Sequence, residues 1–257
     1  MPALRSERDG AVLRVTLASP ERRNAFDAAL IAELTEAFAP EAVGDARAVV
    51  LAGEGPSFCA GADVEWQRSS IDLTYEENVE DALRLHRMLE AIDECPAPVV
   101  CRVHGFALGG GSGLVACCDI VVAAPDTTFG FTEAKLGIIP AVISPFVLAK
   151  IGSSARRLFT TGERFGAETA IRIGLVDEVS EDPDAVVERL VAELLTSGAG
   201  AAREAKRLVL HPPERAELPA LAARMRTSEE GQEGLRAFLE KRAAEGGWGV
   251  FAPRGEA

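Results

Sequence analysis

The sequence predicts an α/β fold, a mostly parallel sheet covered by helices, followed by a C-terminal helical region. Short apolar runs with the character of strands alternate with helical segments before Pro145. Several of these runs are apolar on both faces, as expected of parallel strands that helices cover on both sides. After Pro145 the pattern is almost wholly helical. Hydrophobic residues form 47% of the 257-residue chain, which is enough for one main core.

The N-terminal half supplies the predicted strands. A strand is expected over residues 11–18, where hydrophobic and polar residues alternate, and a hairpin partner should precede it. Apolar residues at helical spacing predict a helix over residues 24–39, which ends at Pro40. Three further strands are expected at residues 48–53, 98–103 and 119–124. A long amphipathic helix is expected between the first two of them, at residues 75–92.

The C-terminal half supplies helices that cannot form a sheet. They are expected at residues 145–151, 154–162, 167–174, 184–209 and 218–243. Such a helical tail should pack against the core or against another subunit. The last residues, 246–257, contain glycine and proline without periodicity and are expected to be loosely ordered.

Charge and hydropathy exclude several classes of protein. A net charge of -13 repels nucleic acid and anionic membranes, so an anionic ligand must be held by local positive groups. The longest apolar run, residues 138–149, is interrupted by Pro140 and Pro145 and is too short to span a membrane. The N-terminus lacks the apolar core of a signal peptide, so we expect a cytoplasmic protein.

The cysteines and histidines do not predict a metal site. Five cysteines are an odd number, and Cys117 and Cys118 are adjacent, with apolar residues around them. This suits buried free thiols in a reducing compartment. None of the three histidines stands at metal-ligand spacing from another histidine or cysteine. We therefore expect no metal.

Two glycine-rich loops are the most informative features. FCAGADVEW (residues 58–66) and HGFALGGGSGL (residues 104–114) each follow an apolar strand. Glycines let a ligand approach the main chain and leave amide N–H groups free, as an oxyanion-binding site requires. The alternative is that the glycines only permit tight turns. Neither loop has the spacing of a phosphate-binding loop or of a dinucleotide fingerprint.

The two loops and the later segment ACCDIVVAAPDTTFGFTEAKLGIIP, in this order and at these separations, resemble the defining segments of the enoyl-CoA hydratase/isomerase (crotonase) superfamily. The resemblance extends through TGERFGAETAIRIGLVDEV and GLRAFLEKR to cover nearly the whole chain. It implies a crotonase-like spiral of ββα repeats over residues 1–195 and a C-terminal helical trimerisation region over residues 196–257.

The resemblance also implies the catalytic groups. The two oxyanion-hole amides fall on Ala62 and on Gly110, the middle glycine of the triplet, and the acid/base carboxylate falls on Glu133. Taken alone, without the resemblance, Glu133 would be interpreted as a solvent-exposed carboxylate in the first turn of a helix. The best-known hydratases carry a second glutamate three residues after the middle glycine, where this chain has Gly113.

Coenzyme A contacts are implied in the first loop, in ERRNAF and in the terminal helix, at Arg22, Arg23, Ala25, Ala60, Asp63, Val64, Phe238 and Lys241. Phe238 and Lys241 would reach the adenine end from a neighbouring subunit of a homotrimer or a dimer of trimers, and their spacing suggests one shared helix face. One of the two arginines could instead be a solvated surface residue, and Asp63 could serve only to fix its loop. Trp66, Gln67 and residues 69–75 are expected to shape the acyl pocket.

The activity implied is hydration of a short or branched-chain 2-enoyl-CoA through a thioester enolate, with coenzyme A entering as part of the substrate and no separate cofactor. GADVEWQR, GGGSGLVACCD, TEAKLGIIPAVISPFV and EGQEGLRAFLEKR are most similar to bacterial methylglutaconyl-CoA hydratases, which act in leucine and acyclic terpene breakdown. Because Gly113 replaces the second glutamate, the alternatives are a Δ3,Δ2-enoyl-CoA isomerase, another crotonase reaction such as decarboxylation, dehalogenation or thioester hydrolysis, or a non-catalytic CoA binder.

Overall fold

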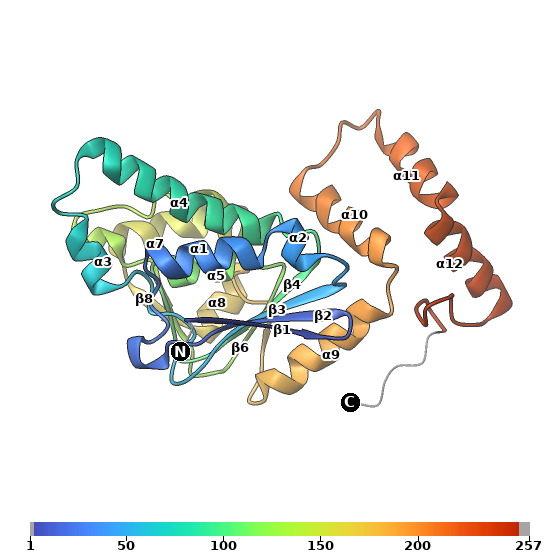
Figure 1. Ribbon diagram of the computed structural model, residues 1–257, viewed down its shortest axis with the longest axis horizontal. Helices are drawn as coiled ribbons and strands as arrows, with labels where there is room; N and C mark the ends of the chain where they lie inside the picture. Colours follow the sequence, from blue (N-terminus) through green and yellow to red (C-terminus); the bar gives the residue numbers. More distant parts are fainter. Residues whose placement is uncertain (1–2, 252–257) are drawn as a thin grey trace.

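The computed structural model describes residues 3–251, which form a six-stranded sheet, a three-stranded sheet and surrounding helices. The larger sheet has the order β1-β2-β3-β4-β6-β9 (Figure 1). Its strands are β1 (Leu4–Asp9), β2 (Val12–Leu17), β3 (Ala48–Gly53), β4 (Val99–Val103), β6 (Ile120–Ala123) and β9 (Glu178–Val179). β1 and β2 form the expected antiparallel hairpin, and every later pairing in this sheet is parallel. The predicted α/β class and its strands are confirmed.

Both faces of the larger sheet are covered. α1 (Ala28–Ala37) and α4 (Tyr75–Asp93) lie on one face, and α9 (Pro183–Leu195) lies on the other (Figure 1). Because side chains alternate along a strand, Val99 of β4 joins the main core while Val100 packs in a second core with Val187 and Val191 of α9. The apolar character of both strand faces therefore reflects burial on both sides.

The smaller sheet carries one of the two glycine loops. It has the order β5-β7-β8, formed by β5 (Phe106–Leu108), β7 (Thr128–Gly130) and β8 (Arg164–Gly166). The sequence did not predict these strands, because three residues are too few to show periodicity. β5 leads directly into α5 (Gly110–Ala116), so the GGG triplet spans the strand-to-helix turn.

The helix expected over residues 24–39 begins only at Ala28. Asp27 caps it by accepting hydrogen bonds from the N–H groups of Ala29 and Leu30. Asn24 has a φ of 54° and is fully buried. Its side chain accepts from the Ser19 N–H at 2.9 Å and donates to the carbonyl oxygens of Glu54 and Ser57 at 2.9 and 2.8 Å. Asn24 therefore organises a turn instead of starting a helix.

The other helices agree with the sequence in place but not always in length. The long segments 184–209 and 218–243 are each broken into two helices, the second at Ser228, which caps α12. The remaining helices are α2 (Pro40–Val43), α3 (Val64–Ser69), α6 (Ser144–Ile151), α7 (Ala155–Thr161), α8 (Ala167–Ile173), α10 (Ala199–Leu210), α11 (Leu218–Thr227) and α12 (Glu229–Glu240). Short 3-10 turns lie at Pro20–Arg22, Glu133–Leu136 and Gly152–Ser154.

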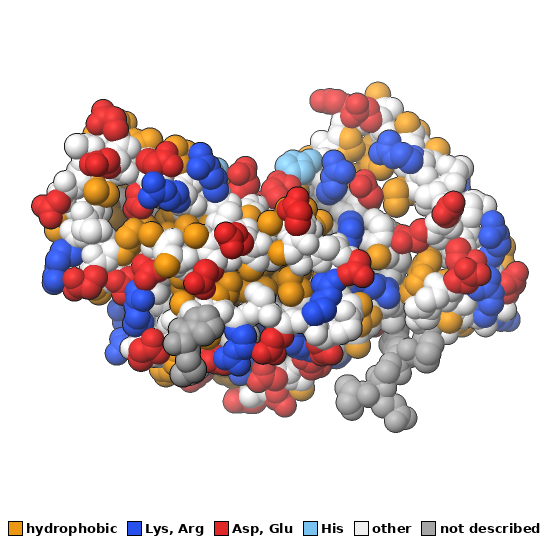
Figure 2. Space-filling model, in the orientation of Figure 1, with side chains coloured by type: hydrophobic (Ala, Val, Ile, Leu, Met, Phe, Trp, Pro, Cys, Tyr) orange, Lys and Arg blue, Asp and Glu red, His pale blue; other side chains and the backbone are white. Residues whose placement is uncertain are grey.

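Helices α10, α11 and α12 extend away from the sheets as an arm (Figure 1). A deep notch separates this arm from the core (Figure 2). The nearly buried Lys206 of α10 ties the arm to the core through Asp119 at 2.8 Å. Residues 246–251 are not loosely ordered as expected: the Gly249 N–H donates to the Thr196 carbonyl at 2.7 Å, and the Trp248 ring lies against Gly234. Residues 252–257 lie outside the described part. The division at residue 195 stays a prediction.

Candidate active site

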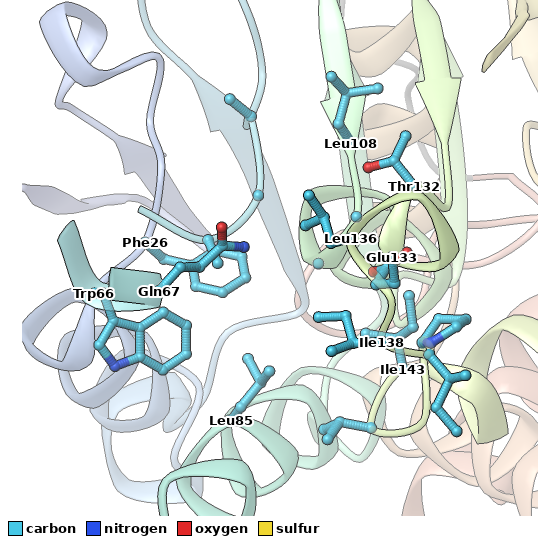
Figure 3. A pocket seen from close by; sticks show the side chains of 18 of the residues that line it. Phe26, Trp66, Gln67, Leu85, Leu108, Thr132, Glu133, Leu136, Ile138 and Ile143 are labelled. Carbon is cyan, nitrogen blue, oxygen red and sulfur yellow. The ribbon is translucent and has the colours of Figure 1, made fainter. Parts of the chain in front are cut away.

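A cavity of about 460 Å³ lies where the two glycine loops meet α3, α4 and the segment after β7. Figure 3 shows Phe26, Trp66 and Gln67 on one side of it and Thr132, Glu133, Leu136 and Ile138 on the other. The apolar side chains that line it are Phe26, Ala60, Ala62, Val64, Trp66, Leu85, Leu108, Leu136, Ile138, Ile139, Pro140, Ala141, Val142 and Ile143. Its polar side chains are Gln67, Ser70, Asp81, Thr132, Glu133 and Arg164. A mostly apolar cavity with a few convergent polar groups is typical of a ligand site.

The first loop is held by a short bridge to the segment before α1. The Phe26 N–H donates to the Gly61 carbonyl, and the Asp63 N–H donates to the Phe26 carbonyl, both at 2.9 Å. In such a bridge the residue between the two bonded positions, Ala62, directs its own N–H away from the partner strand. Gly61 has a φ of 92°, and a Cβ there would lie 2.5 Å from the Leu108 carbonyl oxygen, so only glycine fits.

The second loop runs beside the first. Cys59 pairs with Ala107 in a parallel bridge, and the Leu108 N–H donates to the Cys59 carbonyl at 3.1 Å. Gly109 has a φ of 52° and caps α5, whose first N–H belongs to Gly110. A Cβ built on Gly61 would lie 3.6 Å from the Gly110 nitrogen. The amides of the two loops are therefore neighbours.

Two main-chain N–H groups at this junction have no acceptor. Within residues 3–251, neither the Ala62 nor the Gly110 N–H donates a hydrogen bond, and both residues line the cavity. The first N–H groups of any helix lack partners within it, which accounts for Gly110. Each amide follows a glycine with positive φ. Two convergent free amides can bind an oxygen atom that gains negative charge during a reaction.

Glu133 places a carboxyl group beside these amides. A Cβ on Gly109 would lie 3.2 Å from Glu133 Oε1. Glu133 Oε2 is buried and has no hydrogen-bond partner among residues 3–251. Burial raises the pKa of this carboxyl, and a hydrogen bond from its own backbone N–H offsets part of the rise. The alternative of a solvent-exposed carboxylate is therefore wrong, and the group is suited to proton transfer in the cavity.

Gly113 lies behind the cavity wall and cannot carry a side chain in this arrangement. A Cβ there would lie 2.5 Å from Ile143 Cγ2 and 3.0 Å from Ile143 Cβ. Ile143 is 3% exposed and lines the cavity. Besides Glu133, the acid lining the cavity within the described residues is Asp81, which lies 3.8 Å from Arg84. The position three residues after Gly110 is a glycine and offers no carboxylate, and Ile143 occupies the space that a side chain there would need.

The residues expected to contact coenzyme A in the first loop border the cavity or adjoin it. Ala60 and Val64 line it, whereas Arg22 and Asp63 line a shallow depression that shares Trp66 with it. Arg22 forms ion pairs with Asp27 at 2.9 Å and with Asp63 at 3.0 Å. Asp63 also caps α3 by accepting from the Glu65 and Trp66 N–H groups. Asp63 thus fixes its loop through these contacts, and its contact with coenzyme A stays a prediction.

Arg23 and Ala25 contribute through the main chain. The Arg23 side chain is exposed, its φ is 54°, and its carbonyl accepts the Ala60 N–H at 3.0 Å, which fastens the first loop. Ala25 is buried, and its N–H donates to the Arg22 carbonyl at 3.1 Å. Of this pair, only Arg23 presents a side chain to solvent.

Phe238 and Lys241 do not reach the cavity within one chain. Phe238 is half exposed and stacks on Phe251 with ring centroids 6.1 Å apart. α12 ends at Glu240, and Lys241 follows with a φ of 56°. The expectation that Phe238 and Lys241 share a helix face is therefore wrong, because the helix ends between them.

The sequence identified part of the acyl wall. Trp66 and Gln67 line the cavity, but within residues 69–75 only Ser70 does. Leu85 and Ile143 were not expected there. The apolar periodicity of α4 indicates an inward face, yet nothing local tells which of its residues meets a cavity.

Metal and membrane signals are absent from the described residues. Within residues 3–251, no group of three or more histidine, cysteine, aspartate or glutamate side chains is arranged to hold a metal ion. No helix in that range is long and apolar enough to cross a membrane.

Comparison with known proteins agrees with this geometry. The sequence model described as Enoyl-CoA hydratase/isomerase matches residues 7–247. The cyclohexa-1,5-dienecarbonyl-CoA hydratase of Thauera aromatica is 34% identical over 249 residues, which cover 93% of each chain. The structure of Pseudomonas aeruginosa AtuE superposes with a TM-score of 0.90 at 35% identity, covering 98% of this chain and 100% of AtuE. An enoyl-CoA hydratase from Shewanella pealeana gives 0.88 at 34% identity, covering 95% and 96%.

Proposed function

The chain belongs to the enoyl-CoA hydratase/isomerase family, and on that premise we propose that it is an enoyl-CoA hydratase. It adds water across the 2,3 double bond of a short or branched-chain 2-enoyl-CoA. The observation that carries the proposal is that three groups meet in one apolar cavity: the amides of Ala62 and Gly110 and the carboxyl of Glu133, none of which has its hydrogen-bonding capacity filled by any of residues 3–251. Hydro-lyase names among relatives about a third identical support the reaction class.

In the proposed reaction the thioester carbonyl oxygen accepts hydrogen bonds from the Ala62 and Gly110 amides. Glu133, as a carboxylate, removes a proton from water while the water oxygen bonds to the β-carbon. The electron pair of the double bond moves to the carbonyl oxygen and forms an enolate. Glu133 then returns that proton to the α-carbon, so one carboxyl serves as base and then as acid. Each donor to the developing oxyanion is worth about 3 kcal/mol.

The acyl group is proposed to be short or branched. The wall formed by Trp66, Leu85, Ile138 and Ile143 is apolar, which suits a hydrocarbon chain. The resemblance to methylglutaconyl-CoA hydratases makes 3-methylglutaconyl-CoA one candidate. Its processing would place the enzyme in leucine or terpene breakdown.

Coenzyme A is proposed to be the only cofactor-like group and to enter with the substrate. Contacts would come from the main chain around Ala60, from Val64, and from the segment that holds Arg22 and Arg23. Phe238 and Lys241 would act from a neighbouring subunit in a homotrimer or dimer of trimers. Exposed apolar residues on α12, such as Leu239 at 78% exposure, support burial of this helix between subunits. Five free cysteine thiols support a cytoplasmic location.

A second candidate is a Δ3,Δ2-enoyl-CoA isomerase. The observation that favours it is that, among the described residues lining the cavity, Glu133 alone offers a carboxyl oxygen that is buried without a partner. One group that removes a proton from one carbon and returns it to another is sufficient for a double-bond shift.

A panel of thioesters distinguishes the two reactions. Purified enzyme would be given crotonyl-, 3-methylcrotonyl-, 3-methylglutaconyl- and a 3-enoyl-CoA, with mass and conjugated-enoyl absorbance followed together. Gain of one water with loss of absorbance supports the hydratase. A rise in absorbance from the 3-enoyl thioester without a change in mass indicates the isomerase. No turnover on any member of the panel would refute both.

A further inference from the structure

Ile143 stands at an unusual point of the cavity wall. It immediately precedes α6, its side chain is 3% exposed, and its Cγ2 and Cβ lie where a side chain on Gly113 would begin. Gly113 itself is buried and does not line the cavity. The cavity wall at this point therefore consists of the Ile143 side chain, resting directly on a helix backbone that carries no Cβ.

The contact is specific to this pair of residues. A Cβ at 2.5 Å from Ile143 Cγ2 is closer than real Cβ atoms approach, so any larger residue at 113 would displace Ile143 into the cavity. Conversely, shortening Ile143 would open space over Gly113 that is continuous with the cavity. The room available to an acyl chain thus depends on the Gly113–Ile143 pair.

We infer that Ile143, seated on Gly113, is the residue that limits the length of the acyl group. The inference rests on the proposed function for the identity of the ligand, an acyl-CoA thioester. Its consequence is a substrate class: thioesters whose acyl chain ends before the Gly113–Ile143 contact are accepted, and longer straight chains are excluded by overlap with the Ile143 side chain.

The test compares crotonyl-, 2-hexenoyl- and 2-octenoyl-CoA as substrates of the native enzyme and of Ile143→Ala. We expect the kcat/KM ratio of octenoyl to crotonyl to rise by about 10-fold or more, since a methylene in an apolar pocket is worth about 10- to 200-fold. Val147→Ala is the matched control: Val147 is fully buried one turn further along α6 and does not line the cavity. It should lose thermal stability without changing that ratio. An unchanged ratio in Ile143→Ala overturns the inference.

The contact itself is tested by a double-mutant cycle on thermal stability. Gly113→Ala alone should lower the Tm, because its Cβ meets Ile143 Cγ2. Ile143→Ala removes Cγ2 and with it the 2.5 Å contact with a Cβ at position 113. The Cβ of residue 143 remains 3.0 Å from that position, and a small shift relieves this approach. The double variant should therefore be more stable than the sum of the single effects indicates. If the changes in Tm caused by the two substitutions add strictly, residues 113 and 143 are not coupled.

Binding separates a failure of this inference from a failure of the proposed reaction. Saturated butyryl-, hexanoyl- and octanoyl-CoA cannot be hydrated, so their affinities, measured by titration calorimetry, do not depend on turnover. If the enzyme hydrates no thioester but Ile143→Ala still shifts the affinity toward octanoyl-CoA, the length limit holds and the proposed reaction is wrong. If the enzyme hydrates its substrate and Ile143→Ala binds the three saturated thioesters with the same relative affinities as the native enzyme, the length limit is wrong.

Discussion

Replacing Glu133 by glutamine separates the chemistry of the site from its stability. Glutamine has nearly the same shape, so the cavity and the Ala62 and Gly110 amides should persist. What is lost is a group that can take and return a proton. Because both proton transfers pass through this carboxyl, and each contributes about 10²- to 10⁴-fold, we expect kcat to fall by about 10³-fold or more. That loss corresponds to about 4 kcal/mol or more.

The same change should not weaken the fold. Glu133 Oε2 is buried and has no partner in the part of the chain that the structure describes, and burial raises the pKa of the carboxyl because the charged form is disfavoured there. Glutamine carries no charge, so it does not bear the cost of burying the charged form of this group. The Tm of Glu133→Gln should therefore not fall below that of the native enzyme at neutral pH. Activity should fall without a loss of stability.

The assay is steady-state turnover of crotonyl-CoA together with thermal unfolding and butyryl-CoA binding. Asp81→Asn is the matched control, since Asp81 also lines the cavity and lies 3.8 Å from Arg84. It should change kcat by less than about 10-fold, well below the range for a proton-transferring group. Comparable losses in both variants, or a Glu133→Gln enzyme that turns over normally, would refute the assignment of Glu133.

Other substitutions and conditions test the remaining account. Because the pKa of Glu133 is raised in the folded state, this group stabilises the protein below its unfolded-state pKa, and that stabilisation is lost as the pH rises through the folded-state pKa. Over the same pH range kcat/KM should rise, because the carboxylate form is the base. Stability and kcat/KM measured against pH for the native enzyme and Glu133→Gln test this, and parallel profiles in the two proteins would contradict it. Lys206→Met should destabilise the protein by about 2 kcal/mol in denaturant titrations, because the Asp119 carboxylate loses its 2.8 Å ion pair and keeps the hydrogen bond from the Val99 N–H. A loss near zero would count against the arm's attachment. Asn24→Ala should cost about 3 kcal/mol, since it removes two buried hydrogen bonds and one partly buried one at the turn before the first loop. Stability equal to that of the native enzyme would disprove that role. Trp66→Ala should alter the preference among acyl groups, measured as kcat/KM for crotonyl- against 3-methylcrotonyl-CoA, and unchanged preference would remove Trp66 from the acyl wall.

The sequence was sufficient where a pattern repeats locally. Alternation and apolar runs located the strands at residues 11–18 and 48–53, and periodicity located α4. The glycine loops indicated free amides because positive φ and close backbone approach demand glycine, as at Gly61. These features depend on few neighbours in space.

The sequence was insufficient where long-range contacts decide. Asn24 looks like part of a helix, but its hydrogen bonds to distant carbonyl groups hold it in a left-handed turn. The place of Ile143 over Gly113 joins residues 30 positions apart, and no local pattern reveals such a contact. Lys241 continues the apparent periodicity of α12 yet lies beyond its end, because the helix stops in a left-handed residue.

Isotope labelling of a single turnover tests most directly whether two amides and one carboxyl perform hydration. Crotonyl-CoA would be incubated with the enzyme in deuterated, oxygen-18 water, and the product analysed by mass spectrometry and NMR. The account predicts one oxygen-18 at the β-carbon and one deuterium at the α-carbon, both absent with Glu133→Gln although butyryl-CoA still binds. Recovery of unlabelled crotonyl-CoA from the native enzyme, with butyryl-CoA bound normally, would contradict it.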